Sequence, residues 1–210
     1  MRYGLVVLTA GFTGLLSFSL LAVAIGTDYW YIIDVNKPNY TGPDDLSSHS
    51  GLWRIIEGAN RSSVIPSFTA NMSSLSEAER HLLGLHKVVV IVLPLNLILL
   101  VFGWIFGLVS SLARSPNLLA GTASYFLFCS VFTLAGVSIY IRYSNQAMEE
   151  FRRVVDPENL AYVDVSFGWS LATAWISYSL EVATGLLLML AARITQMKGH
   201  YDSGVTIAIL

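Results

Sequence analysis

The chain has 210 residues, of which 54% are hydrophobic and only 12% are charged, and its formal net charge is −2. Soluble domains average about 25% charged residues, so this composition indicates a membrane protein and argues against a soluble one. No basic run suggests nucleic acid as a partner, and the single cysteine, Cys129, excludes an internal disulfide and a thiolate metal centre.

Four apolar stretches are long enough to cross a hydrocarbon core of about 30 Å, which requires roughly 20 residues. They occupy residues 5–27, 87–112, 118–141 and 167–194. We therefore expect one four-pass domain over residues 1–210, with outer loops at 28–86 and 142–166 and a tail at 195–210.

The first stretch has an alternative interpretation, because Arg2 and Ala22-Val23-Ala24 around an apolar run also fit a cleaved signal peptide. The run is longer than the usual signal-peptide core of about 7–15 residues. Ala10 and Gly14 place small residues at i and i+4, a spacing that lets another helix approach closely. These features favour a retained helix.

The loop after the first span contains three N-x-S/T sequons, at Asn39, Asn60 and Asn71. Three acceptor sites in one loop predict that it is extracellular and glycosylated, with cytoplasmic termini and a plasma-membrane location. In this orientation more basic residues lie in the outer loops than on the cytoplasmic side, which is the opposite of the positive-inside rule. That rule is weakest for long loops.

The same loop begins with aromatic and β-branched residues at 28–33 and is apolar again at 51–56, and both segments are predicted to be strands. Residues 36–45 are rich in turn formers, whereas 61–76 are polar with no clear period. Ser76 and Glu79 match a capping box, so the second helix is expected to begin outside the membrane.

The second span contains Pro94, which is expected to kink the helix, and a Gly103-xxx-Gly107 step. This step predicts close packing within the bundle, with dimerisation as an alternative. Helical periodicity at 147–155 predicts that the third helix continues past the membrane until Asp156-Pro157. Residues 161–165 alternate in the polarity of their side chains and can form a further strand of a small antiparallel sheet.

The fourth span contains Glu181 near its middle, where an acid costs about 2.5–3.5 kcal/mol on insertion scales. We expect Glu181 to face the bundle as a hydrogen-bonded polar clamp. No other span has an acid or base at its middle, which argues against an ion pathway. The residues that could bind it are Asn96, Ser130, Thr133 and Ser177.

Trp30 followed by Gly51-Leu52-Trp53, within four spans and a long first outer loop, resembles the superfamily of claudins, peripheral myelin proteins and calcium-channel gamma subunits. Segments 47–54, 134–140 and 165–170 look closest to the branch of transmembrane proteins 235 and 114. The resemblance implies an all-α membrane protein with a small extracellular β-sheet, built as a left-handed four-helix claudin-like bundle. The loop disulfide usual in the family is missing, because Ile56 stands where its first cysteine would be.

An enzyme is not expected, because the four histidines lie in loops or near helix ends and no nucleophile, phosphate-loop or metal-ligand spacing occurs. No cofactor is expected either. The resemblance favours an accessory protein that binds a channel or receptor laterally in the bilayer. Claudin-like cell–cell adhesion, a structural membrane role and homo-oligomerisation are alternatives.

Overall fold

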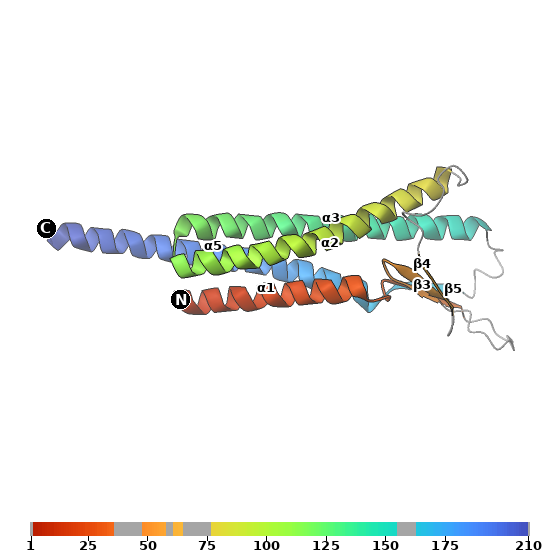
Figure 1. Cartoon of the computed structure of the whole chain (residues 1–210), viewed down its shortest axis with the longest axis horizontal. Helices are drawn as coiled ribbons and strands as arrows, with labels where there is room; N and C mark the ends of the chain where they lie inside the picture. Colours follow the sequence, from red (N-terminus) through yellow and green to blue (C-terminus); the bar gives the residue numbers. More distant parts are fainter. Residues whose placement is uncertain (1, 36–47, 58–60, 65–76, 155–162, 210) are drawn as a thin grey trace. The chain divides into compact units, whose positions relative to one another are not determined.

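The computed structural model describes residues 2–35, 48–57, 61–64, 77–154 and 163–209 (Figure 1). These residues form two compact units. The helical unit comprises Met1–Leu20, Asn96–Phe132 and Ile176–Leu210, and the sheet unit comprises Leu21–Leu95 and Thr133–Trp175. Each unit is described by itself.

Four long helices confirm the four predicted spans, since each is long and apolar enough to cross a membrane. They are α1 (Tyr3–Gly26), α2 (Glu77–Ala113), α3 (Pro116–Val154) and α5 (Trp169–Ile209). Helix α2 begins before its apolar run, and α3 continues past its own, as predicted. Helix α5 continues beyond residue 194, where its predicted span ends.

In the helical unit the four helices form a bundle in which α1 and α3 each contact both α2 and α5. The Trp104 indole of α2 bonds Gly11 of α1, and Thr13 of α1 bonds Thr184 of α5. A Cβ atom at Gly103 would lie 2.8 Å from Cε1 of Tyr125 in α3. This close approach supports the prediction that the Gly103-xxx-Gly107 step packs against another helix of the same chain.

The sheet unit contains a five-stranded antiparallel sheet with the strand order β4-β3-β2-β1-β5. The strands are β1 (Tyr31–Val35), β2 (Ser48–Ser50), β3 (Arg54–Glu57), β4 (Arg61–Val64) and β5 (Val163–Phe167). The first strand of the chain, β1, lies beside the last strand, β5, and the two pair over their whole length.

The predicted small sheet is confirmed, but its strand boundaries and number differ from the expectation. Residues 28–30 precede β1, and residues 51–53 form the connection between β2 and β3. Strands β2 and β4 were missed because both are polar and lack the alternation that identifies a half-buried strand. Residues 36–45 and 161–162 lie outside the described residues.

Candidate functional site

The end of α1 is covered by the two tryptophans that carry the sequence signature. The last carbonyl groups of a helix have no partner within the helix. The indole Nε1 of Trp30 donates to the Ala24 carbonyl oxygen at 2.7 Å, and the indole Nε1 of Trp53 donates to the Ile25 carbonyl oxygen at 2.9 Å. The signature tryptophans therefore cap the C-terminus of α1.

Trp30 also joins the sheet to two helices. Its side chain is fully buried, and its ring centroid lies 4.9 Å from that of Tyr140 in α3. Its backbone N–H donates to the Ser50 carbonyl oxygen at 2.9 Å, and its carbonyl oxygen accepts from the Gly168 N–H at 3.0 Å. A single residue thus contacts the end of α1, β2, α3 and the residue that precedes α5.

Gly51 lies in a position that has no room for a side chain. Its N–H donates to the Arg54 carbonyl oxygen at 3.0 Å, which closes the turn between β2 and β3. A Cβ atom here would lie 2.7 Å from Cα of Asp28 and 2.8 Å from the Thr27 carbonyl oxygen. Glycine is therefore required so that this turn can approach the backbone that leaves α1.

Leu52 and Trp53 serve different purposes in this turn. Leu52 is fully buried, and its carbonyl oxygen lies 2.6 Å from Nε2 of His86 in α2. The Trp53 side chain is 42% exposed, so its contribution comes from its hydrogen bond to Ile25 more than from burial. Burial therefore fixes Trp30 and Leu52 in this region, whereas Trp53 is held by its hydrogen bond.

An ion pair closes the same turn against the end of α1. Arg54 Nε donates to Asp28 Oδ2 at 2.7 Å, and the exposed fractions of the two side chains are 53% and 10%. Sequence reasoning did not find this pair or the His86 contact. The available signal was a pair of opposite charges, Arg54 directly after Trp53 and Asp28 two residues before Trp30. These charges indicate a contact only once the two segments are known to meet.

The connection from β5 to α5 is packed against the segment that leaves α1. A Cβ atom at Gly168 would overlap the Tyr29 carbonyl oxygen, which accepts a hydrogen bond from the Ser170 N–H at 3.2 Å. The Ser170 hydroxyl also lies 2.5 Å from the Thr27 hydroxyl. The fourth helix begins at Trp169, two residues after the approximate start expected from the sequence, because Phe167 ends β5.

Glu181 is fully buried in the helical unit, and its Oε1 accepts a hydrogen bond from the Asn96 amide at 3.2 Å. Asn96 is also fully buried. Of the other candidate partners, Ser177 donates to the Ser17 carbonyl oxygen at 2.7 Å. The structure thus brings together the two polar residues that were singled out within the spans and links α2 to α5.

The potential metal ligands His, Cys, Asp and Glu are not clustered in the part of the chain that the structure describes. No group of three potential metal ligands occurs among those residues. The ring of His49 stacks on Tyr29 with 4.4 Å between centroids. The predicted glycosylation sites, Asn39, Asn60 and Asn71, lie outside the described residues.

Comparisons with known proteins agree with this arrangement. The sequence profile of the PMP-22, EMP, MP20 and claudin tight-junction family matches residues 15–190. The match covers the second half of α1, the whole sheet, α2, α3 and α5 as far as Leu190.

Individual relatives are voltage-dependent calcium channel gamma subunits. The chain is 28% identical over 178 residues to the gamma-5 subunit of Mus musculus, which covers 80% of this chain and 63% of the relative. It is 28% identical over 188 residues to the gamma-4 subunit of Homo sapiens, which covers 81% and 56% respectively. The chain thus spans less than two thirds of the length of these relatives.

Proposed function

The chain belongs to the family of PMP-22, EMP, MP20 and claudin tight-junction proteins, and we propose that it is a non-enzymatic accessory subunit of a membrane channel or receptor. It binds its partner laterally in the bilayer and modulates it without performing chemistry of its own. Its similarity to calcium channel gamma subunits across 80% or more of the chain carries this proposal.

The geometry of the signature supports a scaffolding role. The indole N–H groups of Trp30 and Trp53 and the carboxylate of Asp28 are all bonded within the chain. The signature therefore stabilises the fold and leaves the outer surfaces of the sheet and helices to contact partners. A catalytic site would instead present such groups to a substrate.

For topology, we propose that the sheet is extracellular, the termini are cytoplasmic and the protein resides in the plasma membrane. Sequons at Asn39, Asn60 and Asn71 support this orientation. Glycosidase treatment should lower the apparent mass, and each Asn→Gln substitution should remove part of that shift. Absence of any shift in the unaltered chain would contradict the orientation.

The experiment that tests the accessory role is purification of the tagged full chain, in mild detergent, from cells that express it naturally. Mass spectrometry of the eluate should find a channel or receptor subunit in stoichiometric amount. A matched purification of a different tagged four-pass protein from the same cells identifies non-specific membrane proteins. Recovery of this chain alone would contradict the proposal.

Cell–cell adhesion is the second candidate, because the matching family includes tight-junction proteins. Adhesion requires copies on opposed cells to meet through their outer loops. Mixed cultures of expressing and non-expressing cells separate the two functions. Enrichment only where two expressing cells touch would favour adhesion, whereas uniform surface distribution with a co-purified channel favours the accessory role.

A further inference from the structure

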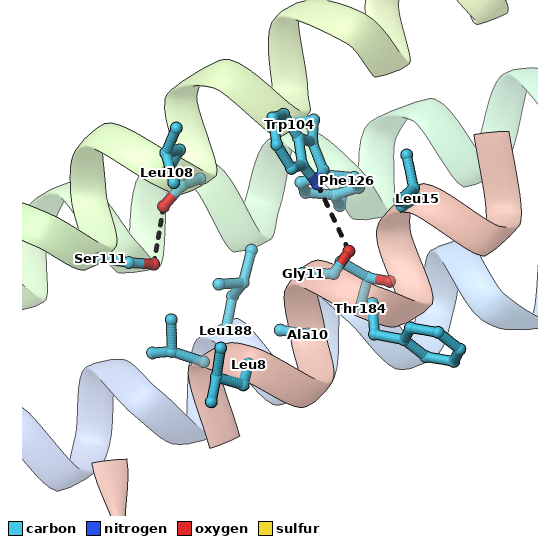
Figure 2. A pocket seen from close by; sticks show the side chains of 13 residues that line it. Leu8, Ala10, Gly11, Leu15, Trp104, Leu108, Ser111, Phe126, Thr184 and Leu188 are labelled. Atoms are coloured by element: carbon cyan, nitrogen blue, oxygen red, sulfur yellow. Dashed lines mark hydrogen bonds between the residues drawn. The ribbon is translucent and has the colours of Figure 1, made fainter. Parts of the chain in front are cut away.

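The helical unit contains a cavity of about 320 Å³ between α1 and α2, which is at the lower end of the range for small-molecule sites, about 300–1,000 Å³. Figure 2 shows Trp104 opposite Gly11, with Leu8, Leu15 and Leu108 around them and Leu188 at the base. All of these residues lie in membrane-spanning helices. Leu8, Leu15 and Leu108 are exposed on the outside of these helices, so the cavity opens toward lipid.

The polar groups that line the cavity are already bonded within the protein. Each of its three polar side chains donates to a backbone carbonyl group. The pairs are Trp104 with Gly11, Ser111 with Gly107, and Thr184 with Leu180. A polar ligand would find no free donor on these side chains, so the chemistry of the wall fits an apolar occupant.

The cavity extends along α1 from Val7 to Leu15, a rise of about 12 Å at roughly 1.5 Å per residue. One leaflet of a hydrocarbon core about 30 Å thick has a similar depth. The dimensions therefore suit one acyl chain that enters from a single leaflet.

The end of the helical unit beyond Val7 is basic. The Tyr3 hydroxyl donates to the Ser111 carbonyl oxygen at 2.9 Å, and the Arg114 guanidinium lies 5.4 Å from the centre of the Tyr3 ring. Arg2, Arg114, Arg193 and Lys198 are all exposed. Among the described side chains of this unit the acidic one is Glu181, which is buried within the span.

We propose that this cavity binds one acyl chain of an anionic phospholipid, whose headgroup lies beside Arg114. The apolar wall holds the chain, and Arg114 on the basic rim selects the negative headgroup. The proposal requires only that the helices span a bilayer, so it does not depend on the identity of any protein partner.

Trp104 provides a direct readout, because bromine atoms on an acyl chain quench tryptophan fluorescence on contact. The full chain is placed in phosphatidylcholine vesicles that contain a small fraction of brominated lipid, either phosphatidylglycerol or phosphatidylcholine. The signal lost in the Trp104→Phe variant isolates the contribution of Trp104. The brominated phosphatidylglycerol should quench Trp104 about fivefold more effectively, which is the preference expected from one basic residue near the surface.

Two glycines of α1 offer a matched pair of variants. A Cβ atom at Gly11, which lines the cavity, or at Gly4, which does not, would meet nothing within 4 Å. Gly11→Leu should fill the cavity and abolish the excess quenching of Trp104, whereas Gly4→Leu should leave it unchanged. Arg114→Gln should keep the quenching but remove the preference for the anionic lipid.

Equal quenching by the two lipids, unaffected by Gly11→Leu, would overturn the proposal. Stronger quenching of Trp104 by a brominated sterol than by brominated phosphatidylglycerol would also overturn it, because the occupant would then be a sterol.

Discussion

The indole Nε1 of Trp30 donates a 2.7 Å hydrogen bond to the carbonyl oxygen of Ala24, in the last turn of α1. Indole suits this task because it is only a donor and combines a polar N–H group with a large apolar body. Helix ends near a membrane interface need such partners, because little water is available to satisfy their carbonyl groups. The family signature is therefore a helix cap supplied by the segments that build the sheet.

Gly168→Ala should destabilise the chain by about 3 kcal/mol or more, because the new methyl group would overlap the Tyr29 carbonyl oxygen. Gly26→Ala is the matched control, since a Cβ atom there would meet nothing within 4 Å. That control should be neutral or stabilising by up to about 1 kcal/mol. Thermal unfolding in detergent measures both variants, and equal midpoints would contradict the close packing at Gly168.

The ion pair between Asp28 and Arg54 should show a coupling free energy of about 1 kcal/mol in a double-mutant cycle of Asp28→Asn and Arg54→Gln. Solvent reduces this value because the Arg54 side chain is half exposed, while the nearly buried Asp28 keeps it above zero. The pair of Glu150 and Arg153, which is more exposed, serves as the comparison and should couple less. A coupling no larger than that of the comparison pair would show that Asp28 does not need its partner.

Glu181→Gln should leave stability nearly unchanged, because the amide oxygen can still accept the hydrogen bond from Asn96. Glu181→Leu removes this acceptor and should cost about 1–2 kcal/mol. Unfolding in mixed detergent micelles provides the comparison. If Gln were as destabilising as Leu, the carboxyl group itself would be required, which would contradict a purely structural clamp.

The membrane class, the four spans and the extension of α3 could be predicted from the sequence, because long apolar runs and helical periodicity are local signals. A polar partner for Glu181 could also be predicted, because a buried acid needs one and few residues inside the spans can provide it. Asn96 was one of the four candidates. Choosing Asn96 from four candidates required the relative rotation of the helices, which no local pattern contains.

The details of the capped end of α1 could not be predicted for the same reason. The bonds of Trp30 to Ala24 and of Trp53 to Ile25 join residues that lie in different segments of the first loop and helix. The carbonyl groups involved have no side-chain signature at all. Strand β2 depends likewise on its neighbours, because Ser48–Ser50 is polar and becomes a strand by pairing with β1 and β3.

The central structural claim is that the signature tryptophans act through their indole N–H groups. Trp53 and Trp169 are 42% and 49% exposed, but of these two side chains only that of Trp53 donates an indole hydrogen bond to another described residue. The thermal unfolding midpoints of Trp53→Phe and Trp169→Phe therefore test it most directly. Trp53→Phe should lose about 1–3 kcal/mol more than Trp169→Phe, or roughly 2–4 °C per kcal/mol. Equal midpoints for the two variants would contradict the claim.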